Sequence, residues 1–464
     1  MLPCRYRRAF PGFAAFLLLS PCSLAGGVRI VEPTGTQNFA TIQAAIDAAP
    51  DGSVLLVGEG NYAGFQVNGK PLAIFAVPGA TVTVDWVSVT GIPAGQVLIL
   101  GGLHVTAAPA QPLAVSNSAG QVRCQDCEFR ATDLDYEFCP FTPSPGAPGA
   151  TVTNCDRVLF SACTFRGGKS EDQDDSLPNG MCTDPGPPGG PGLQATGSAG
   201  QTIVFYDCSL QGGRGGGVKA FPGDGGSGAS ISTIRVLASG TSFHGGPGGT
   251  NYLDTFGECD GDGGPGCALA SGSSLDEIGC MFQGGYGGFG ENGCTAAFAP
   301  GITGGSANSM TGPARKATIL QTVQSDASAW SVAYQGTAGD RPLLFTASSP
   351  QVSISLAFHG AWALRRNTLL STKNLGLVHP DGSISGSAPA SDLPAGSLFQ
   401  LRAAQVAVRA TTGVYLGSPK DLLLLDRDSG PDCNGNGVND FLDVIEGTSA
   451  DANHNLIPDS CPGG

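Results

Sequence analysis

The sequence predicts a mainly β chain whose first two thirds wind into a parallel β-solenoid. A short phrase occurs five times, apolar strands precede it, and no helical periodicity separates the copies. The Phe or Leu positions of successive copies are 36, 45, 33 and 39 residues apart. A fixed core with inserts of different length is typical of coils that stack on one another and carry variable loops. The copies are 127–130, 163–168, 208–213, 241–246 and 280–285.

Each copy predicts one inward and one outward set of side chains. Positions two apart share a face of a strand, so the Cys and the Phe or Leu point inward together. The inward cysteines should stack as a buried ladder: Cys127, Cys163, Cys208 and Cys280. One outward row is Glu128, Thr164, Ser209, Ser242 and Met281; the next is Arg130, Arg166, Gln211, His244 and Gln283. Small or acidic residues mark the bend before each copy: Asp126, Ala162, Asp207, Gly240 and Gly279.

The N-terminal part predicts a cover for the first coil. Residues 39–49 place Ile42, Ala45, Ile46 and Ala49 on one stripe of a short amphipathic helix. Buried strands are expected at 54–57 and 72–77. The run FATIQAAIDAAPDGSVLLVGEGNYAGFQVNGKPLAI resembles the opening of secreted right-handed parallel β-helix proteins of the pectin-lyase-like superfamily. The resemblance implies a right-handed β-helix domain over residues 28–305, without implying lyase activity.

Residues 1–25 are expected to be a signal peptide, because a basic start, an apolar stretch and Ser23-Leu-Ala25 follow one another. No later run is long enough to span a membrane. The formal net charge of −15 disfavours nucleic acids and anionic membranes as partners. We therefore expect a secreted or cell-surface protein, monomeric, that contacts a polysaccharide or a cell-surface protein.

An exported chain can form disulfides. The best candidates are the cysteines of the loops: Cys139, Cys155, Cys182, Cys259, Cys267 and Cys294. The pair Cys124 and Cys127 is interpreted as a coincidence between a ladder cysteine and its neighbour, without zinc or redox function. The inserts at 185–200, 212–228, 245–266 and 284–305 are rich in Gly without a strict three-residue period, so they are expected to be loops. The acidic stretches 172–175 and 254–262 are expected to be solvated.

From residue 315 to 426 the pattern changes to short alternating strands with turn signals, which predicts a small antiparallel β-sandwich. Its aromatic side chains could stack on carbohydrate, but aromatic residues of a sandwich more often belong to the core. We therefore expect Trp330, Tyr334 and Trp362 to be buried.

The tail, 430–464, carries the strongest chemical signal. Oxygen-bearing side chains occupy positions 1, 3, 5, 9 and 12 of a loop with Gly437 at position 6, which is the Ca²⁺-loop spacing. The expected ligands are Asp432, Asn434, Asn436, Asp440 and Asp443 with the carbonyl of Val438.

A second copy follows 19 residues later with Asp451, Asn453, Asn455 and Asp459, but Leu456 replaces the Gly. It is either a weaker site or one completed by other oxygens. The tail resembles dockerin-type and thrombospondin type-3-like EF-hand Ca²⁺ repeats. Cys433 and Cys461 bracket the unit and are expected to pair.

The outward rows offer weak catalytic candidates only: Arg130, Arg166 and Glu128. Acid–base cleavage of a polysaccharide needs converging carboxylates, or carboxylates with Ca²⁺ and a basic residue. The rows hold no carboxylate pair, and the sequence has no paired-Asp segment followed by Gly-His-Gly. The leading hypothesis is a non-catalytic exported β-helix protein for surface attachment or for carbohydrate or protein binding, with a Ca²⁺-stabilised tail. The alternative is a polysaccharide lyase or hydrolase that uses the Arg130/Arg166 face.

Overall fold

The computed structural model describes most of the chain after residue 26. The described ranges are 27–33, 39–107, 111–134, 137–138, 144–174, 186–217, 222–250, 260–288, 297–310, 314–319, 322–326, 328–354, 358–389, 393, 397–410, 413–428, 430–453 and 456–462. The expected signal peptide and four of the loop cysteines lie outside these residues: Cys139, Cys182, Cys259 and Cys294.

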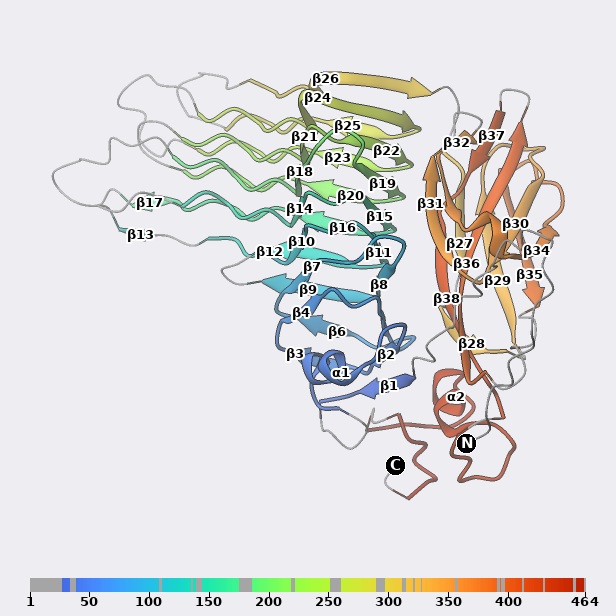
Figure 1. The fold of residues 1–464 in the computed structure, drawn as a ribbon. Helices are drawn as coiled ribbons and strands as arrows, with labels where there is room; N and C mark the ends of the chain where they lie inside the picture. Colours follow the sequence, from blue (N-terminus) through green and yellow to red (C-terminus); the bar gives the residue numbers. More distant parts are fainter. Residues whose placement is uncertain are drawn as a thin grey trace, which may run out of the picture.

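The N-terminal two thirds form a parallel β-helix, which confirms the predicted fold class (Figure 1). Each coil contributes one short strand to each of three faces. The first face contains β1 (Val28–Val31), β2 (Val54–Val57), β5 (Ala73–Ala76), β8 (Val97–Gly101), β11 (Gln121–Gln125), β15 (Arg157–Ser161), β19 (Thr202–Tyr206) and β22 (Arg235–Ser239). The second contains β4 (Phe65–Asn68), β7 (Val87–Thr90), β10 (Leu113–Ser116), β14 (Ala150–Thr153), β18 (Leu193–Thr196) and β21 (Ala229–Ser232).

The third face carries the repeated phrase. Its strands are β3 (Gly60–Tyr62), β6 (Val82–Val84), β9 (Leu103–Ala107), β12 (Glu128–Ala131), β16 (Thr164–Arg166), β20 (Ser209–Gln211), β23 (Ser242–His244) and β25 (Met281–Gln283). The last two coils run over the first two faces without a break, as β24 (Cys267–Ile278) and β26 (Ile302–Met310). Two short strands, β13 (Glu137–Phe138) and β17 (Gln173–Asp174), pair beyond the third face.

The inward side chains form the predicted ladders. Phe129 stacks on Phe165 with ring centroids 5.3 Å apart, and Phe243 stacks on Phe282 at 4.9 Å. The ladder cysteines are free thiols, and Cys127, Cys163 and Cys208 are buried. Burial raises the pKa of Cys127 and Cys163 well above the ordinary value, so these thiols pack as small apolar groups.

The bends before each copy take the left-handed backbone conformation. The φ angles are 51° at Asp126, 53° at Ala162, 51° at Asp207, 60° at Gly240 and 57° at Gly279. Only Gly, and less readily Asn or Asp, takes this conformation at little cost. The Asp and Gly residues at four of the five bends are therefore explained by the turn they make, whereas Ala162 is not.

Helix α1 (Ile42–Ala48) covers the first coil, as predicted. Thr41 caps it by accepting a hydrogen bond from the backbone N–H of Ala44 at 3.2 Å. Ile42, Ala45 and Ile46 are buried against the strands of the first coils.

Outside β18 and β26, the described parts of the Gly-rich inserts contain no helix or strand, as expected of loops, but backbone hydrogen bonds hold them in layers. Segments 167–171, 212–216, 245–249 and 284–288 leave the third face, and segments 144–149, 187–192, 223–228, 261–266 and 297–301 return. Figure 1 shows them as parallel traces beside the coil. We call these nine segments the glycine bundle.

A three-residue period organises the glycine bundle. Gly212 and Gly215 donate backbone hydrogen bonds to the carbonyls of His244 and Pro247, so neighbouring outgoing segments run parallel. Gly246 and Gly249 donate to the carbonyls of Gly226 and Gly223, so outgoing and returning segments run antiparallel. Repeats of three residues without internal hydrogen bonds are the hallmark of the polyproline II conformation.

Close approach of the backbones explains the glycines. A Cβ on Gly246 would lie closer than 3.0 Å to the carbonyl oxygen of Gly213, and a Cβ on Gly213 equally close to that of Gly168.

The acidic stretch that begins at Asp172 also differs from the expected solvated loop. Asp172 is buried, accepts a hydrogen bond from the N–H of Gly217 and pairs with Lys169.

The C-terminal third forms three smaller sheets beside the first face (Figure 1). One contains β27 (Lys316–Ile319), β29 (Ala329–Gln335) and β35 (Ser383–Pro389). Another contains β28 (Val323–Ser325), β38 (Lys420–Leu425), β36 (Phe399–Ala410), β30 (Pro342–Ala347), β34 (Leu369–Asn374), β32 (Phe358–His359) and β37 (Gly413–Leu416); β31 (Pro350–Ile354) pairs with β33 (Ala361–Leu364). Most pairs are antiparallel, but β28–β38 and β32–β37 are parallel. As expected, Trp330, Tyr334 and Trp362 are buried.

The first face is buried on both sides because the sandwich covers it, which explains its continuous apolar strands.

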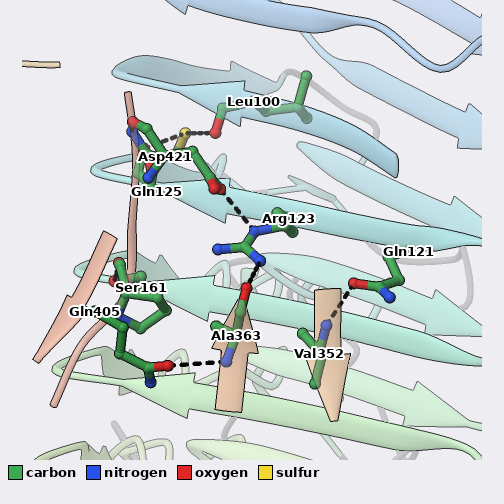
Figure 2. Close-up of polar contacts among 11 residues, drawn as sticks. Leu100, Gln121, Arg123, Gln125, Ser161, Val352, Ala363, Gln405 and Asp421 are labelled. Atoms are coloured by element: carbon green, nitrogen blue, oxygen red, sulfur yellow. Dashed lines mark hydrogen bonds and ion pairs between the residues drawn. The ribbon is translucent and has the colours of Figure 1, made fainter. Parts of the chain in front are cut away.

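Figure 2 shows the polar contacts across this junction. Arg123 of β11 forms an ion pair with Asp421 of β38, Nε to Oδ2 2.6 Å, and donates from Nη1 to the carbonyl of Ala363 at 2.9 Å. Burial raises the pKa of Asp421, and the charge of Arg123 opposes this rise. A buried charge without its partner is costly, so the pair requires the sandwich to stay docked.

Candidate binding face and candidate calcium site

The outward rows of the third face lie in the predicted register. Glu128, Thr164, Ser209, Ser242 and Met281 are Cα partners on successive strands. The second row follows in the same register with Arg130, Arg166, Gln211, His244 and Gln283. Arg130 and Arg166 therefore lie side by side on an exposed face, about 4.8 Å apart along the backbone ladder.

His104 joins this face from the coil before the first copy. It is the partner of Glu128 in the β9–β12 ladder, and its Nδ1 lies 3.1 Å from Oε2 of Glu128. Sequence reasoning missed it because its coil lacks the repeated phrase. The signal was present, because Leu103 and Val105 alternate with His104 as the inward Cys and Phe alternate with Glu128.

The same face continues onto the glycine bundle. A further row lies three residues beyond the arginines and consists of Asp133, Lys169, Arg214 and Pro247. Backbone hydrogen bonds hold its segments in register, from Leu134 to Lys169, from Ser170 to Arg214 and from Gly215 to Pro247. In that row, Oδ2 of Asp133 lies 3.6 Å from Nη2 of Arg166. Arg214 donates a hydrogen bond from Nη2 to Oγ1 of Thr250 at 2.8 Å.

We call the surface of His104, Glu128, Arg130, Arg166, Lys169 and Arg214 the cationic face. It holds four of the chain's 23 Lys and Arg residues on two adjoining rows, in a protein of net charge −15. Its mixture of donors and acceptors suits a polar, anionic ligand. Glu128 on this face and Asp133 and Asp172 beside it each face a basic group, namely His104, Arg166 and Lys169, so none of the three forms a carboxylate pair.

The first tail loop brings four of its expected ligands together. Asp432 accepts from the N–H groups of Asn436 and Gly437 at 3.1 and 2.9 Å, and Gly437 takes a φ of 79° as position 6 requires. The amide nitrogens of Asn434 and Asn436 both donate to the carboxylate of Asp443, at 2.8 and 2.9 Å to Oδ2.

The surroundings of Asp443 fit a cation. Its carboxylate is buried, yet among the described residues no Lys or Arg lies within ion-pair distance. Burial would raise its pKa, but hydrogen bonds from Thr448, Asn434 and Asn436, together with the charge of Arg427, outweigh burial and hold the pKa below the ordinary value. Rotation of the two amides would turn their oxygens toward the space that their nitrogens now face.

The Asp at position 9 of each loop has a structural contact. Oδ1 of Asp440 accepts from the N–H of Cys433, and Oδ1 of Asp459 accepts from the N–H of Ala452, both at 3.0 Å. These bonds are equivalent in the two loops and close each loop on its second residue. Val438, whose carbonyl is the expected ligand at position 7, donates its N–H to Oδ1 of Asn436 and buries its side chain.

The second loop keeps the backbone of the first but changes the use of position 6. The N–H of Leu456 donates to Asp451 as that of Gly437 donates to Asp432, and Leu456 takes a φ of 64°. Its side chain is buried with Val54, Leu56 and Val77 of the first coils. This burial, worth about 2 kcal/mol, offsets the left-handed backbone, which costs about 1–2 kcal/mol. Asn453 is exposed, and Asn455 lies outside the described residues.

Cys433 and Cys461 form the expected disulfide. Their sulfurs lie beside Asp440, but sulfurs joined to each other are not thiolate ligands. For two of the loop cysteines the prediction of a disulfide is wrong, because Cys155 and Cys267 are buried free thiols. The tail helix α2 (Asp440–Ile445) packs Phe441 and Leu442 against the sandwich and the first face.

No protein-family model and no curated protein matches the sequence. Among solved structures, pectate lyase Pel9A aligns at 12% identity with a TM-score of 0.27, over 61% of this chain and 78% of that chain. The protein ORF18 of Geobacillus virus E2 aligns at 12% identity with a TM-score of 0.25, over 83% and 85%. Among the described residues, no helix is both long and apolar enough to cross a membrane. The parallel β-helix fold follows from the strand pairing itself.

Proposed function

We propose that this chain is an exported, non-catalytic β-helix protein that binds an anionic polysaccharide or an acidic surface protein through the cationic face. The observation that carries the proposal is the in-register pair Arg130 and Arg166, extended by Lys169 and Arg214 on the glycine bundle. Like charges on neighbouring strands repel one another. Asp133 offsets part of this repulsion at Arg166, and a bound anion would offset the rest.

Binding to immobilised polyuronate, measured by surface plasmon resonance, tests this function. The double change Arg166→Ala and Arg214→Ala should weaken binding at least tenfold, since charge-assisted hydrogen bonds are each worth about 1.5–3 kcal/mol. Arg409→Ala is the matched control, because Arg409 is an exposed arginine of the sandwich. Equal loss in the control, or no binding by the unmodified protein to polyuronate and acidic protein alike, would refute the proposal.

We propose one Ca²⁺ site in the tail, held by Asp432, Asn434, Asn436 and Asp443 with the Val438 carbonyl. The buried carboxylate of Asp443 and the convergence of three further oxygen-bearing side chains support it. The ion would neutralise this carboxylate and fix the loop. Asp451 and Asp459 belong to a loop whose Leu456 is buried against the coil, so the second loop serves mainly as an anchor.

Calorimetric titration of the full chain with Ca²⁺ should give one ion per chain. Asp432→Ala should abolish the heat, whereas Asp451→Ala should leave the stoichiometry at one. A stoichiometry of two ions would show that both loops bind Ca²⁺. Loss of binding in Asp451→Ala but not in Asp432→Ala would place the site in the second loop. Saturation at about 100 times Kd should stabilise the tail by about 2.7 kcal/mol.

A polysaccharide lyase is the second candidate function, because His104 lies within hydrogen-bond distance of Glu128 beside the two arginines. A base and a carboxylate at such a distance could move a proton of a bound sugar. New unsaturated ends on a uronan, absent in His104→Ala but present in Arg409→Ala, would establish this activity and replace the non-catalytic proposal.

A further inference from the structure

The two ends of the β-helix differ in how they are covered. At the N-terminal end, α1 lays Ile42 and Ile46 over the first coils, and Leu456 of the tail packs on the outer side of the first face with Val54 and Leu56. At the other end, β26 is exposed over residues 304–309 and half-buried at its first and last positions. A β-helix core reaches solvent wherever a coil has no neighbour.

Apolar side chains follow this open end. Met281 is 59% exposed and Phe298 is 69% exposed, and the ring of Phe298 lies 5.0 Å from that of Tyr286. The inward ladder also loses its cover here, because Phe282 is half-buried whereas Phe243 one coil below is 1% exposed. The open end therefore exposes both the ladder and the edge.

The backbone of the last coil is an edge. Among the described strands, β26 pairs with β24 alone and β25 pairs with β23 alone. One side of each strand thus has backbone N–H and C=O groups without a strand partner. These groups favour a partner that itself supplies a strand edge.

The open end is also almost uncharged. From residue 278 to 314 the sequence contains one charged side chain, Glu291, which lies outside the described residues. Soluble proteins usually protect such edges with charged residues or with a covering segment. None of the described residues of 278–288 and 297–310 is charged, so in a chain of net charge −15 this surface is one that a second, equally acidic chain can approach without repulsion.

We propose that the open end, formed by β25, β26 and residues 284–288 and 297–301, joins two copies of this chain end to end. The covered N-terminal end excludes head-to-tail stacking, which would build a filament. When both partners use the same edge, the contact has two-fold symmetry and the assembly is a dimer that cannot grow further. Met281, Phe298 and Tyr286 would be buried in it.

Sedimentation equilibrium of the full chain tests the proposal. The protein should be a dimer that dissociates on dilution, and Met281→Lys with Ser306→Lys should leave monomers by placing two like charges at the contact. Leu370→Lys is the matched control, because Leu370 is 47% exposed on the fully exposed strand β34 of the sandwich. This control should remain a dimer.

A protein that is monomeric at every concentration would overturn the proposal, as would a dimer that the end charges leave intact or that Leu370→Lys dissociates. Hydrogen exchange of the unmodified protein tests the contact in a second way, which does not depend on whether the variants fold. Amides of 302–310 should exchange faster on dilution, whereas those of β15 should not change. Concentration-independent exchange at 302–310 would contradict an end-to-end contact.

Discussion

The later coils of this protein contain two regions that stack on their neighbours by opposite means. In the β region, coils are held by side chains that fill the interior, such as Phe165 with 0% exposure. In the glycine bundle, the backbones themselves are in contact, as where Gly246 donates its N–H to Gly226 across the layers.

The difference shows that stacking of coils does not require a hydrophobic core. The β region gains stability from apolar burial, at about 25 cal/mol per Å². The described parts of the glycine bundle rely on hydrogen bonds between segments, each worth about 1 kcal/mol, and on the lack of side chains that would separate them. The two regions should therefore respond differently to the same type of substitution.

Truncation of an inward side chain should break the β region most. Phe165→Ala removes a ring that contacts Phe129 and Phe160, at centroid distances of 5.3 and 4.9 Å. We expect a loss of about 4 kcal/mol in the free energy of unfolding, measured by urea denaturation with circular dichroism. Thr164→Ala on the same strand, with its side chain outward, should change it by less than about 0.5 kcal/mol.

Enlargement should break the glycine bundle instead. Gly246→Ala places a methyl group against the carbonyl of Gly213, so the layers must separate. We expect a loss of about 2–3 kcal/mol and faster proteolysis of 212–249, detected by mass spectrometry of the fragments. Ser227→Ala in a returning segment should have almost no effect; an equally tolerated Gly246→Ala would show that the contact is loose.

Alkaline pH should weaken the β region through its thiols. Burial raises the pKa of Cys267 to about 12 and raises those of Cys127 and Cys163 well above the ordinary value of 9.0. Because the unfolded chain ionises first, this stability is complete below pH 9 and decreases as the pH rises above it.

The urea midpoint should therefore fall by a small amount between about pH 8 and about pH 10. The change Cys127→Ala with Cys163→Ala should reduce this slope. An unchanged slope in the double variant would assign the pH dependence to other groups, such as the buried Tyr206, whose pKa burial also raises.

The β region could be predicted from the sequence because its period of two residues is local. The spacing of Cys163 and Phe165 assigns both side chains inward, and the repeats give the register of Arg130 with Arg166. The turn of the tail loop could be predicted for the same reason, since the residues that form it lie within twelve positions; the Ca²⁺ site stays a prediction.

The remaining features depend on partners that are distant in the sequence. The donors and acceptors of the glycine bundle lie in different coils, so inserts of unequal length hid their three-residue period. The docking of the sandwich was missed as well, although Arg123 within an apolar strand signalled a partner outside the coil. Only the fold places Asp421 there, 298 residues further along the chain.

The junction with the sandwich has a consequence for how the coil unwinds. Gln125, Ser161 and Tyr206 belong to three successive coils, and each bonds to the sandwich: Gln125 to Asp421, Ser161 to Pro419 and Tyr206 to Ala361. Repeat arrays usually lose terminal units one at a time. Here the sandwich, which is not a repeat, holds these three coils together. Under a pulling force or during proteolysis, the coils should therefore unfold from β26 toward β19 and stop there. The chain should then unfold in two steps rather than one coil at a time.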